Sequence, residues 1–312
     1  MTKYITYEAD LVWMKYIGTM EAEMMESIKN DINSFHPTVQ IVTNRPFYPE
    51  FVFSVQHDED GRSYINVKTI IDRQKQFGSE KEDSYVFILD DVIVGRIKDM
   101  LFAMNLVYPG HIHIVDSILC RNGAPVKLLS FASDLSGMAY NHCTWIPFER
   151  LNINQCWNWL TTKTNFLQDI SKTSIDRALH ALSYESEAND DIFIFYVLMG
   201  IEAIYNDSSN NEYSILAHLK CKIQVVLGDL PPLALKAIGT MYTRCSQLVH
   251  GGANIFKCWS SEDYSDKDAE AVDRERDYMI TATGILIATI QKMIKANANA
   301  LVETITVSLE TQ

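Results

Sequence analysis

The spacing of apolar residues changes near residue 170, and this change limits the architectures that the chain can adopt. Before this point, segments rich in aromatic and β-branched residues, such as residues 4–14, alternate with segments of helical spacing, such as residues 92–106. After it, the periodic segments have helical spacing. A period of two indicates strands and a period near 3.6 indicates helices. We therefore predict an α+β N-terminal domain of mixed strands and helices, residues 1–169, followed by an all-α helical bundle, residues 170–312.

The N-terminal part contains signals for both strands and helices. Its runs of aromatic and β-branched residues predict strands at residues 4–14, 39–43, 51–56, 64–71, 85–89 and 111–119. Apolar residues on one face predict helices over residues 20–32 and 92–106, and Asn154 is a candidate cap for a third helix at residues 155–163. The pair Asn122-Gly123 favours a tight hairpin after the last strand.

The C-terminal part has start and stop signals for five helices. Ser174 is the predicted cap of the first helix, which reaches about residue 187. The others are predicted over residues 190–205 and 214–228, from Pro231 and Pro232 to Gly251-Gly252, and in a long final segment after about residue 268. Proline is tolerated in the first turn of a helix and glycine commonly ends one. Five helices without strands predict a compact bundle.

The charge and composition exclude several classes of protein. The net charge is -13 and neither half is basic overall, which argues against a protein that coats nucleic acid through charge alone. The longest apolar run, residues 192–205, is too short to cross a bilayer and contains Glu202. Six scattered cysteines favour free thiols in a reducing compartment. We therefore expect a cytoplasmic protein without a membrane anchor.

An arginine and a histidine near the end of the fourth helix are the strongest candidates for catalysis. Arg244 precedes His250 by six positions, and two glycines follow. Arginine binds phosphate through a planar fork of donors, and histidine transfers protons near neutral pH. Cleavage of RNA without a metal needs proton transfer, because a 2′-OH must lose a proton and the leaving 5′-oxygen must gain one. It also needs a cation to stabilise the charge that builds up on the phosphate. By chance alone, about 0.8 such Arg–His spacings are expected in this composition.

The helical part resembles the HEPN superfamily, and within it the Apea-like domains. The resemblance is carried by residues 177–182, 195–205 and 241–252, in the order and spacing of a HEPN bundle. Many members are metal-independent endoribonucleases of toxin or anti-phage systems, and their Arg-x(4–6)-His motif falls on Arg244 and His250. The resemblance implies an RNA substrate, a homodimer through the bundle, and no cofactor or metal. It does not extend to the N-terminal domain, whose position suggests that it senses an activating trigger, inhibits the nuclease or selects substrate.

The spacing of the pair explains why such an enzyme would need two protomers. Six positions on a continuous helix correspond to a rotation of about 240° and a rise of about 9 Å. One Arg–His pair is therefore incomplete, whereas in the family two protomers bring two pairs to one cleft. The C-terminal end of a helix favours the imidazolium form, which suits His250 to the role of acid.

Glu202 and Ser246 are candidates for roles that support the Arg–His pair. Glu202 is the only charge between residues 191 and 207, and a buried carboxylate requires a partner. It either forms a structural ion pair, for which Arg244 is a candidate, or orients Arg244 and tunes His250. Ser246 either contacts the phosphate or hydrogen-bonds along its own helix.

Two other interpretations remain open on the sequence alone. Active HEPN members usually have Asn, Asp or His directly after the arginine, whereas this chain has Cys245. That residue favours a non-catalytic HEPN module that binds RNA, a nucleotide or a partner protein. The third hypothesis is a metal-dependent N-terminal enzyme that uses His111 and His113 with Asp116. A metal site needs a third ligand in suitable geometry, which spacing does not supply, so we predict no metal.

Overall fold

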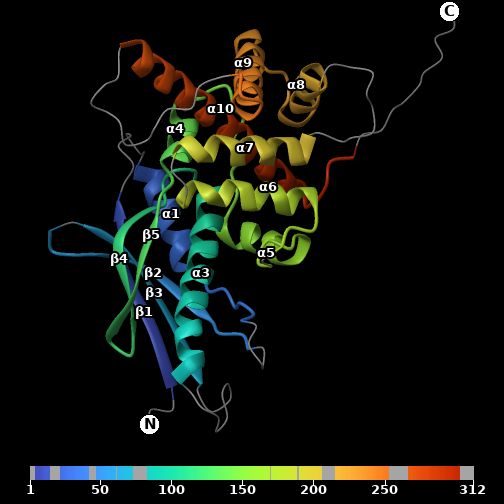
Figure 1. The fold of residues 1–312 in the computed structure, drawn as a ribbon. Coiled ribbons are helices and arrows are strands. Elements are labelled where there is room, and N and C mark those ends of the chain that lie inside the picture. Colours follow the sequence, from blue (N-terminus) through green and yellow to red (C-terminus); the bar gives the residue numbers. More distant parts are fainter. Residues whose placement is uncertain are drawn as a thin grey trace, which may run out of the picture.

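The N-terminal part contains a five-stranded antiparallel sheet (Figure 1). The computed structural model describes residues 4–14, 22–41, 47–60, 62–72, 83–168, 170–187, 190–205, 215–252 and 266–302. The strand order is β2-β3-β1-β4-β5, and each neighbouring pair is antiparallel. The strands are β1 (Tyr4–Met14), β2 (Phe51–His57), β3 (Ser63–Asp72), β4 (His113–Arg121) and β5 (Ala124–Phe131).

One face of this sheet is buried, and the other is exposed or half-buried and carries both polar and apolar side chains. The odd-numbered residues of β1 from Ile5 to Trp13 are buried, whereas its even-numbered residues are exposed or half-buried. On the open face, Glu8 forms an ion pair with Lys68 of β3 at 3.3 Å. Alternation of this kind follows from the two-residue period of a strand, because only one face has helices to pack against.

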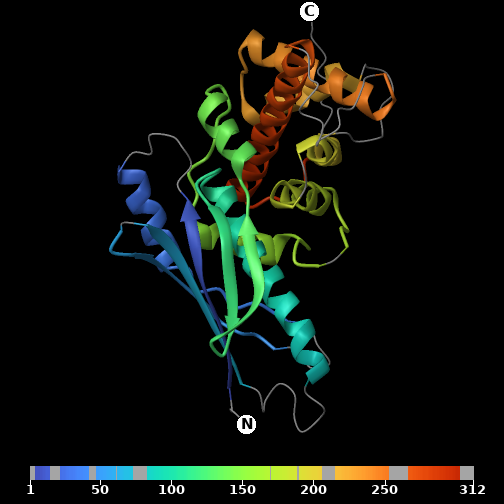
Figure 2. The same ribbon diagram turned by 60° about the vertical axis from the view of Figure 1, so that its left-hand side comes forward.

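Two helices, α1 (Ala22–Asn33) and α3 (Asp83–Val107), contact the sheet on its buried face, and α5 (Ile153–Lys163) packs against both. Phe35, just after α1, stacks on Phe53 of β2 with ring centroids 5.5 Å apart. Its ring also meets Trp157 of α5 edge-on at 5.9 Å. Figure 2 shows α3 running along the sheet. The observed cap of α5 is Asn152, whose side chain accepts a bond from Gln155 N, so the prediction of Asn154 was wrong by two residues.

The predicted strand at residues 85–89 is wrong, because these residues belong to α3. Their aromatic and β-branched composition favours a strand. The helical alternative places buried apolar residues four positions apart on one side, at Leu89, Ile93 and Ile97. It also directs the buried carboxylate of Asp90 toward the sheet. There Asp90 accepts bonds from Arg121 at 2.7 Å and from the Tyr7 hydroxyl at 2.7 Å.

The other strand predictions in this part are mostly confirmed. Asn122 and Gly123 join β4 to β5 with φ values of 50° and 80°, as a two-residue hairpin turn requires. The exception is the segment at residues 39–43. Its described part, which ends at Ile41, forms only an isolated bridge with Phe47, and residues 42 and 43 lie outside the described residues.

Helices make up the described structure after residue 170, as the apolar spacing predicts. They are α6 (Ser174–Ser183), α7 (Asp190–Tyr205), α8 (Ile215–Leu227), α9 (Pro232–Val249) and α10 (Asp266–Ala296), with a short 3-10 turn η1 (Tyr184–Ser186). The cap of α6 is Thr173, which forms a capping box with Asp176, so the prediction of Ser174 was wrong by one residue. One further helix, α4 (Asp134–His142), lies earlier in the chain and packs on α10. The fold is therefore an antiparallel α+β part followed by a helical part.

The long helix α10 connects the two parts (Figures 1 and 2). It packs against α7 and α9 and also against α3 and α4. Gln291, which is fully buried in α10, donates to the carbonyl of Leu106 at 2.7 Å and accepts from the backbone N–H of Glu149 at 2.8 Å. One hydrophobic core therefore runs from β1 to α10 without a break at residue 170.

The same helix is the one candidate membrane span among the residues that the structure describes. The stretch Arg276–Ala296 is long and apolar enough to cross a bilayer. However, 78% of its apolar window is buried inside the protein. Gly200 of α7 and Gly284 of α10 are small enough for close packing, since a Cβ on either would meet a neighbouring side chain at under 3.0 Å. The apolar surface of α10 is thus used by the protein core.

Candidate functional site

His250 lies at the C-terminal end of α9, where the sequence predicts the helix to stop. Gly251 has a φ of +73°, a conformation that only glycine adopts readily. The backbone N–H of Gly252 donates to the carbonyl of Gln247 at 2.7 Å, and that of Gly251 donates to Leu248 at 3.4 Å. These two bonds form a Schellman motif, which leaves the His250 side chain exposed at the helix end.

Arg244 lies within the same continuous helix and is half-buried. The angle between Arg244 and His250 around the helix axis is about 120° in the shorter direction. The exposed residues Thr243 and Gln247 fall between them on the helix surface. Arg244 and His250 therefore lie on the two edges of the solvent-facing side of α9. The structure brings them to the same face of the molecule but does not direct them to one point.

Glu202 has a partner that the sequence reasoning missed. It is half-buried in α7, and the hydroxyl of Tyr242 in α9 donates to its Oε1 at 3.2 Å. Burial raises the pKa of Tyr242 to about 12, and the Glu202 carboxylate adds to this rise. The helical spacing held a signal for this residue. Tyr242, Ser246 and His250 are four positions apart, so they form one stripe along α9.

Ser246 lies in the middle of this stripe and is half-buried. Its carbonyl accepts the backbone N–H of His250 at 3.0 Å, which is the last turn of the helix. The stripe runs on the side of α9 that carries the Tyr242–Glu202 bond, whereas Arg244 lies on the other edge of the exposed side. Glu202 thus contacts the side of α9 that also carries Ser246 and His250.

The histidines of the suggested metal site have other contacts. The Nδ1 of His111 bonds to the carbonyl of Pro109 at 2.9 Å, and burial lowers the pKa of this ring. His113 lies 3.7 Å from Asp134, between its Nδ1 and the carboxylate Oδ1. Among the described residues, no group of three or more His, Cys, Asp or Glu side chains could hold a metal ion.

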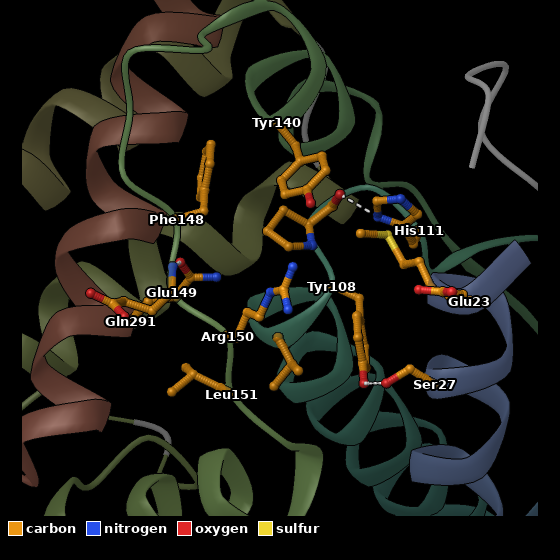
Figure 3. Close-up of a pocket in the computed structure, with 13 residues that line it drawn as sticks. Glu23, Ser27, Tyr108, His111, Tyr140, Phe148, Glu149, Arg150, Leu151 and Gln291 are labelled. Carbon is orange, nitrogen blue, oxygen red and sulfur yellow. Dashed lines mark hydrogen bonds between the residues drawn. The ribbon is translucent and has the colours of Figure 1, made fainter. Parts of the chain in front are cut away.

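A cavity of about 350 Å³ forms a second candidate site, which no sequence motif indicated (Figure 3). It lies where α1, the end of α3, α4, α10 and residues 148–151 meet. Its lining combines three aromatic rings with one arginine, one histidine and two glutamates, and the full set is Glu23, Met24, Ser27, Val107, Tyr108, Pro109, His111, Tyr140, Phe148, Glu149, Arg150, Leu151 and Gln291.

Most polar groups of the cavity are already paired. The Tyr108 hydroxyl donates to Asp31 at 2.8 Å, and burial raises the pKa of Tyr108. Glu149 forms ion pairs with Lys292 and Lys295 of α10, and these two lysines lower its pKa. Arg150 differs, because it is exposed and no carboxylate in the described ranges pairs with it. The cavity therefore offers a cation beside aromatic walls.

Comparisons of the chain with known proteins give no further guidance. No protein-family model, no curated protein and no solved structure matches it. The chemistry of the two candidate sites therefore rests on their own residues. At the end of α9, an exposed imidazole and a guanidinium can transfer protons and hold a phosphate. In the cavity, rings and one cation can hold a small molecule.

Proposed function

We propose that this chain is a metal-independent endoribonuclease of the HEPN type that cleaves single-stranded RNA. The observation that carries this proposal is the placement of Arg244 and His250 on the two edges of the solvent-facing side of α9. Neither side chain is buried in the core, so a phosphodiester can approach both. A five-helix C-terminal part that contains this motif supports the same proposal.

The reaction needs one group to remove a proton and another to supply one. One imidazole takes the proton of the 2′-OH, and this oxygen attacks the phosphorus. The bond between phosphorus and the 5′-oxygen breaks, and a second imidazole protonates that oxygen. The products are a 2′,3′-cyclic phosphate and a 5′-OH. The guanidinium of Arg244 stabilises the extra negative charge on the phosphate in the transition state.

One protomer supplies only one of these imidazoles at the end of α9. We therefore infer a homodimer through the helical part, in which the second His250 completes the site. One apolar side chain beside the motif supports this inference, since Val249 is 54% exposed. Val249 directly precedes His250, so an interface that covers it brings two histidines near each other.

The biological role that fits this activity is that of a toxin or an anti-phage effector. An uncontrolled ribonuclease harms its host, so we assign the α+β part to sensing a trigger, binding an inhibitory partner or selecting RNA. The net charge of -13 means that RNA contacts must be local rather than spread over the surface.

The proposal is tested by incubating the purified protein with labelled single-stranded RNA in EDTA. We expect cleavage that falls about 10²–10⁴-fold in His250→Ala. Arg244→Ala is expected to lose about 10²–10³-fold. The matched control is His142→Ala, because His142 is also an exposed histidine in the last turn of a helix, α4. Cleavage that persists unchanged in His250→Ala would remove the catalytic assignment.

A non-catalytic RNA-binding module is the second candidate. It is favoured by Cys245, which stands where active HEPN members have a polar residue. If the wild-type protein binds RNA without cleaving it, and Arg244→Ala weakens that binding while His142→Ala does not, this second function is the better description.

A further inference from the structure

The cavity beside Tyr108 and Arg150 has no part in the proposed cleavage at α9. Its volume of about 350 Å³ lies within the range of small-molecule sites, about 300–1,000 Å³. We propose that it binds a nucleoside 5′-monophosphate, an aromatic base that carries a single phosphate group. The proposal stands independently of the ribonuclease activity, because none of the cavity residues belongs to α9.

The walls of the cavity suit a flat aromatic base. The Tyr140 ring lies 5.3 Å from the His111 ring and 5.3 Å from the Phe148 ring, between centroids. The Tyr108 ring forms another part of the lining (Figure 3). Any of the nucleobases can stack on an aromatic side chain, because each base has a π-face. A cavity with this many rings favours a planar ligand over an aliphatic one.

The backbone of the lining is held in place before any ligand binds. Gly110 adopts a φ of +74°, and a Cβ on it would lie 1.9 Å from the Cα of Gly137 in α4. The side chain of Asn105 accepts from the Gly110 N–H at 2.8 Å and donates to Ser136 at 3.1 Å. The loop at residues 108–111 is therefore fastened to α4. A preformed site loses little conformational entropy when a ligand enters it.

The charges of the lining select for a phosphate and for a base with amino groups. The guanidinium of Arg150 matches the geometry of a phosphate. Its neighbour Glu149 does not neutralise it, because Glu149 pairs with Lys292 and Lys295. The exposed Glu23 of α1 offers an acceptor for an amino group, and Figure 3 shows Tyr108 between Arg150 and Glu23 in this view. A ligand with both a base and a phosphate therefore meets the aromatic rings, the cation and the acceptor of this lining.

Calorimetric titration of the full chain tests the proposal, with AMP, GMP, CMP and UMP as separate probes. Each nucleotide is compared with its own nucleoside and with inorganic phosphate. We expect at least one nucleotide to bind with 1:1 stoichiometry and more tightly than either of its parts. Arg150→Gln is expected to weaken this binding at least tenfold, roughly the loss of one charge-assisted hydrogen bond.

The matched control is Arg177→Gln, because Arg177 is an exposed arginine on α6 outside the cavity lining. It is expected to leave the affinity unchanged, as is His250→Ala, which separates this site from the proposed nuclease. Tyr140→Leu, which keeps an apolar side chain but removes the ring, is expected to weaken binding as well. The proposal is overturned if no nucleotide binds with a Kd below about 1 mM. It is also overturned if phosphate or a nucleoside binds as tightly as the nucleotide, or if Arg150→Gln binds like the wild type.

Discussion

At the scale of single residues, burial makes the charge of the Glu185 carboxylate costly in the folded protein. Burial raises the pKa of Glu185 to about 7, and the nearby Asp134 adds to the rise. Hydrogen bonds from the backbone N–H and the hydroxyl of Ser136 act in the opposite direction. Glu185, which lies in η1, thereby caps the first turn of α4 although the two elements are far apart in the sequence.

This shift predicts a pH dependence of stability with a definite sign. The folded-state pKa of Glu185, about 7, exceeds its ordinary value of 4.5, so the folded protein binds the proton more tightly. The resulting stabilisation is complete below about pH 4.5 and is lost as the pH rises through 7. In the wild type, Glu185 should lower the free energy of unfolding by on the order of 2–3 kcal/mol between pH 5 and 8. In Glu185→Gln this contribution should be absent. Urea unfolding at several pH values measures it, and identical pH profiles for the two proteins would contradict the assignment.

At the scale of elements, α3 is joined to the sheet by an ion pair whose carboxylate is buried. The carboxylate of Asp90 is 5% exposed and accepts two bonds from Arg121 of β4 and one from Tyr7 of β1. The next residue, Asp91, pairs with Lys127 of β5, but this pair lies at the surface. The two neighbouring aspartates therefore make similar contacts at different depths.

Their depths predict different costs of mutation. Asp90→Asn leaves the Arg121 charge without its partner, and we expect a loss of about 2–4 kcal/mol in the free energy of unfolding. Asp91→Asn breaks a surface pair and is expected to change stability by about 0.5 kcal/mol or less. Urea titration of both variants compares them directly. Equal losses would show that the buried pair does not anchor α3.

The element scale also shows how much of the α9 site could be predicted. The end of the helix at Gly251 was predictable, because a glycine with positive φ is a local backbone requirement. The direction of Arg244 relative to His250 followed from helix geometry alone. The bond between Tyr242 and Glu202 was not predictable, since it depends on how α7 packs against α9. Whether two protomers bring their histidines together remains a prediction.

At the scale of the whole molecule, the core is shared by the sheet and the helices. Buried residues of β1, α3, α4 and α10 belong to one hydrophobic cluster, and Gln291 links α10 to Leu106 and Glu149. The boundary at residue 170 is based on a change of apolar spacing and remains a prediction. A change of element type does not by itself separate two cores.

A shared core predicts cooperative unfolding. We expect thermal unfolding of the full chain to be a single transition, with the same midpoint for tryptophan fluorescence and for the helical circular dichroism signal. The described tryptophans, Trp13, Trp145, Trp157 and Trp159, all lie before residue 170, whereas the helix signal comes largely from the part after residue 170. Two separated midpoints would show that the parts unfold independently, as two domains.

What the sequence by itself determined is local. The strand β1, the hairpin at Asn122-Gly123 and the start of α9 at Pro232 follow from side-chain period and backbone φ, which neighbouring residues set. Composition misled at residues 85–89, a short aromatic and β-branched run that suits either structure, and at residues 39–41, which form no strand.

Only the tertiary structure decided which distant residues meet. The cavity joins Glu23 of α1, Arg150 and Gln291 of α10, which are separated by more of the chain than any motif spans. The choice of helix for residues 85–89 likewise depended on Asp90 reaching Arg121. Contacts of this kind form because packing the apolar faces together brings polar groups to the same place, and no local spacing records that outcome.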